Sequence, residues 1–212
     1  DAENDLENFR TLHSYAFKML GMTKEKMMSA SDYKEFGQKC GIPIKTAKFS
    51  TEDGTFNSDN EYLTIINTAR LKDFTDLLQD FLDQQIKSKF EVLFIDEAQD
   101  LSLLQWKMVK QIWQNVDKTY IAGDDDQAIF KWAGADVDHF IALKSEVDSI
   151  KTLDQSYRIP GGPIHELSQR IISKVQNRFD KNYQPRAEEG ILCRYSDVTQ
   201  VDMSEGNWMV LA

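Results

Sequence analysis

Residues 90–100 read FEVLFIDEAQD, an apolar run that stops abruptly at three carboxylates within five residues. Runs of β-branched and aromatic residues bounded by polar ones are typical of a strand buried on both faces of a parallel sheet. Such a strand would place Asp96 and Glu97 at its carboxyl end, where ligands of open α/β sheets bind. The stretch therefore predicts a buried strand that delivers acidic side chains to a site.

Helices and strands are expected to alternate on both sides of this stretch. Residues 6–20 are predicted to begin with a strand or turn at 9–13 that leads into a helix over 15–20. Helical spacing of apolar residues also covers 60–87, as one long or two shorter helices, and 104–113, 137–143 and 164–175. Further strands are predicted at 118–122 and 149–153. The first helix is expected to stop at Gly21. Strands separated by helices of this length indicate an α/β protein with a parallel sheet built from right-handed crossovers. Residues 22–59 have the weakest pattern, so we expect a small insertion of helices and loops there.

The composition is that of ordinary globular protein. Of the 212 residues, 41% are hydrophobic and 28% are charged, enough apolar material for one large domain or two small ones. The formal net charge of −10, from 25 Lys and Arg against 35 Asp and Glu, argues against binding nucleic acid through a bulk positive field. Any nucleic-acid contact must therefore be local, or shared with other parts of a larger protein.

Cysteine usage and the chain ends limit the setting. Cys40 and Cys193 are far apart and lack a CxxC pattern or a nearby His, so neither a zinc site nor a disulfide framework is indicated. A reducing, cytoplasmic setting is expected. No apolar stretch approaches the roughly 18 residues of a membrane span, and residues 1–5 do not resemble a signal peptide. Both ends look unfinished, which suggests a fragment of a longer protein.

The pair Asp96-Glu97 has two interpretations. One carboxylate can hold a hydrated Mg²⁺ while the other takes a proton from an attacking water, which is what phosphoanhydride hydrolysis requires. Alternatively, the pair belongs to a solvated acidic turn before the next helix, with Asp100 or Ser102 as its N-cap. The pair alone leaves both interpretations open.

Residues 123–136, GDDDQAIFKWAGAD, follow the strand at 118–122 and should lie on the same sheet edge as Asp96. Three consecutive carboxylates repel one another unless a cation or a helix terminus is near. Gln127 can donate to a phosphate oxygen or a catalytic water. Phe130 and Trp132 could form a platform on which a single-stranded base stacks. The alternative is that Trp132 belongs to the core.

Residues 154–160, DQSYRIP, follow the strand predicted at 149–153. Arg158 could bridge phosphate oxygens bidentately, and Tyr157 could stack on a purine. The alternative for Arg158 is a surface salt bridge.

These segments, in this order and approximate spacing, resemble the UvrD/Rep group of superfamily 1 DNA helicases. Residues 96–100 are similar to the family's Walker B motif, 123–136 to its third motif and 153–158 to its fourth. Upstream, 11–16 (TLHSYA) resembles the early DNA-contacting motif, and 73–78 (DFTDLL) the helical segment before Walker B. Together these matches span most of the chain.

The resemblance implies a RecA-like, P-loop NTPase fold, in which a parallel sheet is flanked by helices. Residues 1–21 and 60–152 would form part of the first RecA-like domain, and 22–59 a reduced helical insertion. Residues 153–212 would start the second RecA-like domain, with ATP bound between the two domains.

The resemblance also implies a nucleotide site. Asp96 would organise Mg²⁺, and Glu97 would polarise the attacking water. Gln127 would couple the γ-phosphate to the DNA site. Arg158 would contact the γ-phosphate and Tyr157 would pack against the adenine.

On the DNA side, the resemblance implies that Trp132 stacks on a base of the tracking strand. Phe130, Thr11 and His13 would line the same path. From spacing alone His13 is better explained as a structural histidine, so its DNA role rests on the resemblance. The family's Arg after this Trp is replaced by Ala133, which removes one expected contact.

The implied function is that of an ATP-dependent DNA helicase or translocase, with ATP and Mg²⁺ as cofactors and single-stranded DNA and duplex junctions as partners. The chain contains no Gly-x-x-x-x-Gly-Lys-Ser/Thr loop, so we expect it to be inactive by itself. One alternative is a non-catalytic RecA-like interaction module. Another is a nuclease-linked or recombination relative with the same motor.

Overall fold

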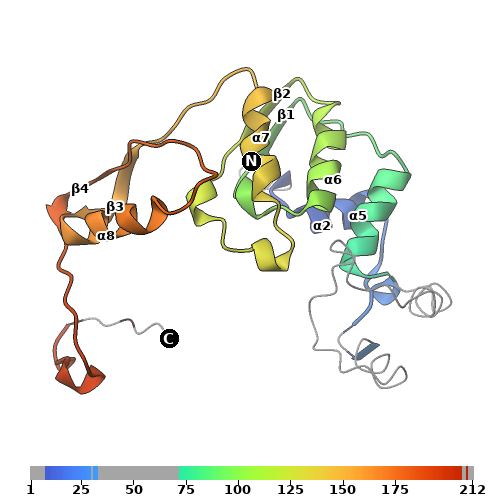
Figure 1. Cartoon of the computed structure of the whole chain (residues 1–212). Coiled ribbons are helices and arrows are strands. Elements are labelled where there is room, and N and C mark those ends of the chain that lie inside the picture. The colour runs from blue at the N-terminus through green and yellow to red at the C-terminus, as the bar shows by residue number, and fades with distance from the viewer. Residues whose placement is uncertain (1–7, 30, 33–71, 207–208, 210–212) are drawn as a thin grey trace, which may run out of the picture. The chain divides into compact units, whose positions relative to one another are not determined.

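The computed structural model describes residues 8–29, 31–32, 72–206 and 209 (Figure 1). The chain divides into two compact units, Asp1–Val147 and Asp148–Ala212. Most of the insertion predicted at 22–59, and the beginning of the helical segment predicted at 60–87, lie outside the described residues. In the part that is described, no helix is long and apolar enough to cross a membrane.

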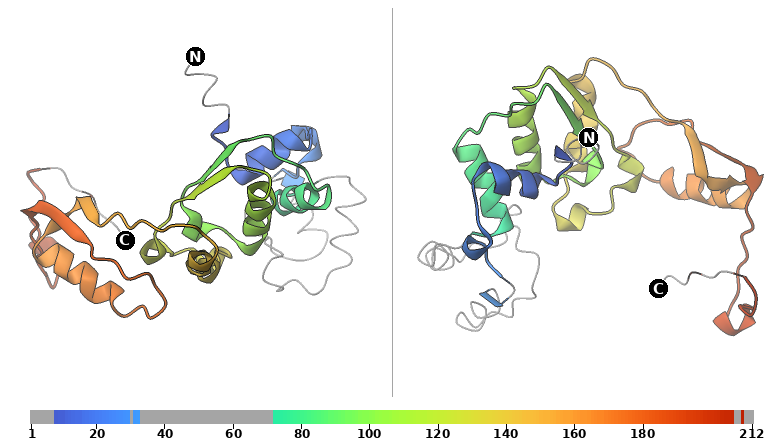
Figure 2. Two further views of the ribbon diagram at one scale, coloured as in Figure 1. Left: turned by 90° about the horizontal axis from the view of Figure 1, so that it is seen from above. Right: turned by 180° about the vertical axis from the view of Figure 1, so that it is seen from behind.

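The centre of the first unit is a parallel strand pair joined by a helix. Strand β1 (Val92–Ile95) pairs with β2 (Lys118–Ile121) in a regular parallel register. Helix α6 (Leu103–Trp113) connects them and lies beside both strands (Figure 2). Both strands and this helix are confirmed within a residue or two of the prediction.

Helix α6 starts with a capping box. The Ser102 Oγ accepts a hydrogen bond from the Gln105 backbone N–H at 3.3 Å, and the Gln105 Oε1 accepts one from the Ser102 N–H at 2.8 Å. Two of the otherwise unsatisfied N–H groups at the helix start are thereby paired. Of the two N-caps considered from sequence, Ser102 is the one used.

The prediction that β1 is buried on both faces is wrong in the described structure. Burial alternates along the strand, and Phe94 is 73% exposed and stacks on Tyr120 at 4.9 Å between ring centroids. The sheet of the described first unit has two strands, and its other face, with Leu93 and Ile95, packs against the core. A face without a covering layer leaves its side chains in water.

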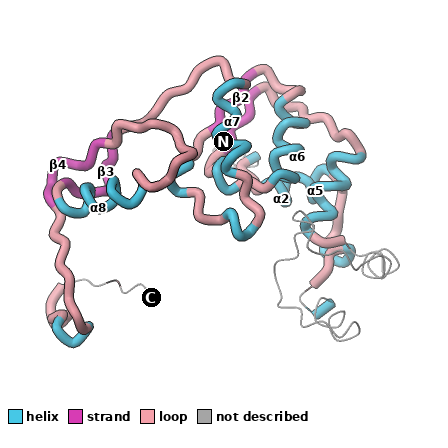
Figure 3. Tube along the Cα trace, in the orientation of Figure 1, coloured by secondary structure: helices cyan, strands magenta, loops and turns pink. Residues whose placement is uncertain are grey.

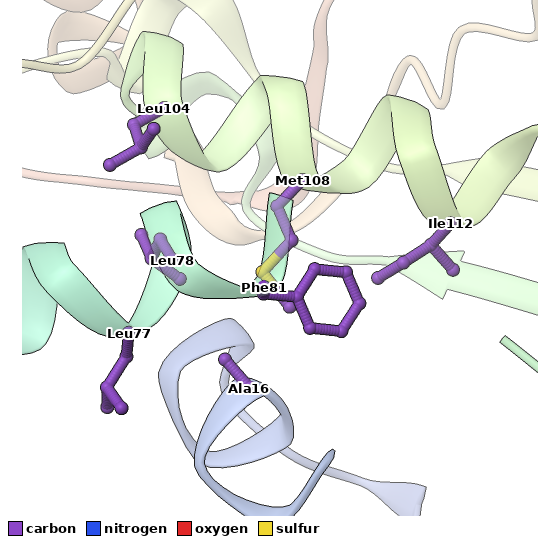
Figure 4. Packing of buried hydrophobic residues seen from close by; sticks show 7 residues of the cluster. All are labelled: Ala16, Leu77, Leu78, Phe81, Leu104, Met108 and Ile112. Atoms are coloured by element: carbon purple, nitrogen blue, oxygen red, sulfur yellow. The ribbon is translucent and has the colours of Figure 1, made fainter. Parts of the chain in front are cut away.

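Three helices build the main core. Helices α2 (Leu12–Met19), α5 (Phe74–Asp83) and α6 lie side by side (Figures 2 and 4). Their shared cluster consists of seven buried apolar residues: Ala16, Leu77, Leu78, Phe81, Leu104, Met108 and Ile112. Each fully buried large side chain contributes about 1.5–3 kcal/mol relative to exposure. Helix α2 ends at Met19 and is followed by Leu20 and Gly21 at φ 60°, which confirms the predicted stop.

The second unit has its own strand pair. Strand β3 (Gln155–Gly161) pairs in parallel with β4 (Gln184–Glu189), and helix α8 (Pro163–Ile172) connects them (Figure 3). The strand predicted at 149–153 is wrong, because the strand begins at Gln155. This pair forms a sheet separate from β1 and β2.

Candidate functional site

The loops after β1 and β2 meet at one edge of the sheet, as predicted. The Ala122 N–H donates to the Ile95 carbonyl at 2.8 Å, and the Ala98 N–H donates to the Ala122 carbonyl at 3.0 Å. These bonds extend the strand ladder past its last residues. They bring together 96–100 and 123–127, which we call the strand-end edge.

Glu97 is held in an unusual backbone conformation. Its φ of 51° and ψ of 42° are left-handed, which costs a non-glycine residue on the order of 1 kcal/mol or more. The Glu97 N–H donates to Oδ1 of the preceding Asp96 at 3.0 Å, which stabilises this turn. The turn lifts both side chains out of the strand, and both residues are exposed.

Gln99 is buried behind these carboxylates, with 1% of its surface exposed. Its Nε2 donates to the Glu97 Oε2 at 2.8 Å, and its Oε1 accepts from the Asp124 backbone N–H at 2.9 Å. No role for Gln99 was predicted from the sequence. A polar residue between a buried alanine and a carboxylate has no periodic signature that would reveal its burial.

The acidic run after β2 is stabilised by a helix terminus. Asp124 caps the short 3-10 turn η5 (Asp125–Gln127), and its Oδ1 accepts from the Asp126 N–H at 3.2 Å. Its Oδ2 accepts from the Gln127 Nε2 at 2.7 Å. The turn therefore supplies donors to a carboxylate that would otherwise be repelled by its neighbours.

The third carboxylate of the first loop has a different environment. The Asp100 Oδ1 is buried and has no hydrogen-bond partner among the described residues. Burial raises the pKa of the Asp100 carboxyl above its usual range, and the negative charge of Glu97 adds to this shift. Asp100 therefore differs from Asp96 and Glu97, which face water.

The described residues could bind Mg²⁺ only together with other ligands, such as the phosphate oxygens of a nucleotide. Among the described residues, no group of three His, Cys, Asp or Glu side chains could hold a metal ion. Mg²⁺ is commonly bound through one or two carboxylates together with phosphate oxygens and waters. The exposed Asp96 can supply one such carboxylate beside a bound nucleotide.

Beyond the edge, residues 129–132 form what we call the aromatic segment. Trp132 is 71% exposed, and its ring centroid is 6.3 Å from that of Phe130, also exposed. The alternative that Trp132 belongs to the core is therefore wrong. The segment is anchored where the Asp136 N–H donates to the Leu101 carbonyl at 2.9 Å.

Thr11 and His13 have structural roles in α2. The Thr11 Oγ1 caps the helix by accepting from the Ser14 N–H at 3.1 Å. The His13 ring packs edge-on against Phe74 at 5.5 Å between centroids, and burial lowers the pKa of its imidazole. Their contact with DNA stays a prediction.

Tyr157 and Arg158 lie within strand β3 of the second unit, not in a loop after a strand as predicted. Both side chains are exposed, and the Arg158 N–H donates to the Oγ of the buried Ser156 at 3.2 Å. None of the ion pairs found among the described residues includes Arg158. Its proposed contact with a phosphate stays a prediction.

Comparison with known proteins identifies the class. The model of the UvrD/REP helicase N-terminal domain matches residues 38–148, a range that includes β1, β2 and the strand-end edge. The chain therefore belongs to this family.

Several individual proteins are similar to the chain. ATP-dependent DNA helicase PcrA of Bacillus subtilis is 29% identical over 133 residues, which cover 62% of this chain and 17% of PcrA. ATP-dependent DNA helicase Rep of Buchnera aphidicola is 27% identical over 150 residues, 65% of this chain and 22% of Rep. The RecB subunit of the Escherichia coli RecBCD enzyme is 31% identical over 96 residues, 44% of this chain and 8% of RecB. The chain thus spans about a fifth or less of the length of these relatives.

Proposed function

We propose that the full-length protein is an ATP-dependent DNA helicase or translocase and that the strand-end edge forms part of its nucleotide site. Family membership and the names of the relatives support this proposal. The observation that carries it is the hydrogen-bonded set Glu97, Gln99, Asp124 and Gln127, which joins two strand ends where α/β proteins bind ligands.

Each polar residue has a proposed task in phosphoanhydride hydrolysis. Asp96 would hold Mg²⁺, which, when bound, supplies charge stabilisation at the phosphate oxygens. Glu97 would accept the proton of the attacking water. The Gln127 amide has two N–H groups; one donates to Asp124, and the other can donate to a phosphate oxygen or to that water. Arg158 and Tyr157 would contact the γ-phosphate and the adenine, a role that rests on the resemblance alone.

The aromatic segment is the proposed contact with single-stranded DNA. Trp132 and Phe130 would stack on bases, since exposed aromatic rings provide sequence-tolerant platforms. Thr11 and His13 would line the same path. This mode of binding suits a chain with a formal net charge of −10, because stacking does not require a positive field.

The fold proposal is a RecA-like motor. The first unit would belong to the first RecA-like domain and the second unit would start the second, with 22–59 as the reduced insertion. Among the described residues, the face with Phe94 and Tyr120 is exposed; in a RecA-like domain a further layer would cover it, because parallel sheets are normally covered on both sides. A cytoplasmic setting stays a prediction.

A nuclease-linked or recombination relative with the same motor is the second candidate. The similarity to the RecB subunit over 96 residues supports it. A non-catalytic RecA-like interaction module is the remaining alternative, and a Gly-Lys-Ser/Thr loop in the full-length protein would argue against it.

The test compares two charge-neutralising variants of the full-length protein. Glu97→Gln should retain ATP binding and lose about 10²–10⁴-fold in DNA-stimulated hydrolysis, the usual contribution of a general base. Glu91→Gln makes the same change at the opposite end of β1 and should behave like the wild type. Normal turnover by Glu97→Gln would refute the assignment, and a wild type that never hydrolyses ATP would favour the module. The 212-residue chain alone should not hydrolyse ATP.

A further inference from the structure

Gln99 is a buried polar side chain, and both of its hydrogen bonds to described residues lie within the strand-end edge. A buried amide is costly unless both of its ends are hydrogen-bonded. Here one end meets the Glu97 carboxylate and the other meets a backbone N–H of the neighbouring loop. Both polar atoms of the buried amide thus have hydrogen-bond partners, and these partners lie on the loops that follow β1 and β2.

The two partners fix which way the amide points. A carboxylate can only accept and a backbone N–H can only donate. The Nε2 must therefore face Glu97 and the Oε1 must face Asp124, so a flipped amide would lose both bonds. A glutamine is complementary to this pair of partners, whereas a glutamate in the same place would present oxygen to oxygen.

The packing around Gly123 restricts the same amide. A methyl group added at Gly123 would come within 2.8 Å of the Gln99 Oε1 and within 2.8 Å of the Phe140 Cζ. The backbone of the loop therefore lies directly against the amide. This close approach limits alternative rotamers of Gln99 and so the position of its Nε2.

The bonds continue to the second proposed catalytic residue. Asp124, whose N–H is bonded to Gln99, accepts from the Gln127 Nε2 through its Oδ2. A path of three hydrogen bonds thus connects the Glu97 carboxylate with the Gln127 amide. Displacement of Gln99 would alter the spacing between the two.

We propose that Gln99 is a positioning residue for ATP hydrolysis: it holds the exposed Glu97 carboxylate in one orientation and couples it to the loop that carries Gln127. The inference rests on the proposed function of Glu97. A mobile glutamate would satisfy the geometry of proton transfer only part of the time, so loss of the Gln99 donor should lower kcat and spare nucleotide binding.

Gln99→Glu in the full-length protein tests this directly. The substitution keeps the shape and the acceptor for the Asp124 N–H, but its carboxyl can donate to Glu97 only when protonated. At pH 8 we expect kcat to fall about 10–100-fold with KM for ATP changed less than about twofold, in line with loss of a charge-assisted bond. The deficit relative to the wild type should shrink as the pH is lowered toward 6, since protonation restores a donor.

Gln79→Glu is the matched control. The Gln79 Nε2 also donates to a carboxylate, the Asp83 Oδ1, at 2.8 Å, but on the exposed surface of α5. This variant should keep the wild-type kcat and pH profile. Gln99→Met, which removes both bonds at similar volume, should lower kcat without recovery at low pH; thermal melting and ATP affinity establish that each variant is folded.

Two results would overturn the inference. One is a wild-type kcat for Gln99→Glu at pH 8. The other is a loss of kcat in Gln99→Glu that has the same size at every pH, or that Gln79→Glu shows as well. Either outcome would indicate a general structural effect. The proposed function is tested separately, by loss of ATP turnover in Glu97→Gln. If that variant loses turnover while Gln99→Glu does not, the inference about Gln99 fails and the proposed function stands.

Discussion

The strand-end edge and the aromatic segment are neighbours in the chain but differ in how the fold holds them. At the edge, Glu97, Gln99, Asp124 and Gln127 bond to one another, and the central amide is buried. In the aromatic segment, Phe130 and Trp132 are exposed to water. Hydrogen bonds between side chains and backbone therefore fix the geometry of the first region, whereas the second presents exposed rings to solvent.

Backbone contacts hold the loop that carries the aromatic segment in place although its rings are exposed. Ser102 and Ala135 form an isolated bridge, and the Asp136 N–H bonds to Leu101. The loop therefore returns to the start of α6 after its exposed rings. A rigid scaffold that presents a short polar and aromatic loop is a common arrangement for binding residues.

The largest expected effect separates two tryptophans. Trp106 is completely buried in the first unit, and Trp106→Ala should lower the free energy of unfolding by about 3–5 kcal/mol. Trp132→Ala should leave it within about 0.5 kcal/mol of the wild type. Urea unfolding of both variants measures the contrast.

The same Trp132→Ala variant should bind single-stranded DNA more weakly by about 1–3 kcal/mol, the contribution of one stacked base. Fluorescence anisotropy with a labelled oligonucleotide measures this. Unchanged DNA affinity together with unchanged stability would remove the aromatic segment from the proposed DNA path.

Gly123→Ala should lower the free energy of unfolding by about 1–3 kcal/mol, the usual cost of overpacking. It should also lower the rate of ATP turnover. The cause is the 2.8 Å approach to Gln99 and Phe140. Gly21→Ala is the control, because nothing lies within 4 Å of its added carbon. With φ at 60°, that variant should lose only about 1 kcal/mol and keep its activity. Equal effects at both glycines would contradict a tightly packed edge.

The backbone conformation of Glu97 predicts an unusual order of stability. Glu97→Gly and Glu97→Ala both remove the carboxylate, but only glycine adopts a φ of 51° without strain. We expect the glycine variant to be more stable than the alanine variant by about 1 kcal/mol, while both lack turnover. Chemical denaturation of the two proteins decides this, and a more stable alanine variant would show that the turn is not strained.

The smallest expected effect is on the pH dependence of stability. It tests whether the His13 ring is packed in the fold or is accessible to DNA. Burial lowers its imidazole pKa below the ordinary value of 6.5, so the unfolded chain binds the proton more tightly. The resulting stability is present above about pH 6.5 and is lost as the pH falls through the lower, folded-state pKa.

His13→Phe should therefore reduce the loss of stability between pH 7.5 and pH 5, as measured by urea unfolding. His139, whose pKa burial also lowers, would account for part of the remaining slope. An unchanged slope in His13→Phe would indicate that the ring is accessible and would return it to the DNA path.

Much of the first unit could be predicted because its signals are local. An apolar run and a turn of carboxylates identify β1, a capping pattern with helical spacing identifies α6, and both lie within a few residues of each other. Their order in turn predicted that the loops after β1 and β2 share an edge. The resemblance to the UvrD/Rep group was confirmed over 38–148.

The errors have non-local causes. Strand β3 is shifted from the predicted 149–153 to 155–161 because its partner is β4, where Gln155 pairs with Gln184. Exposure of Phe94 depends on which layers cover the sheet. The apolar content and spacing of the sequence are the same whether or not a layer covers the strand, so they could not distinguish the two arrangements.

Sequence pattern was sufficient to identify the family and to place the candidate carboxylates at the end of a strand, since residue type and short-range spacing specify these. Tertiary contacts alone distinguish the roles within the site. Gln99 receives its bond from Asp124, which lies 25 residues further along the chain, and Asp100 turns a carboxylate oxygen inward while Asp96 faces water. Burial and long-range hydrogen bonding depend on the packed fold, so no local pattern could assign them.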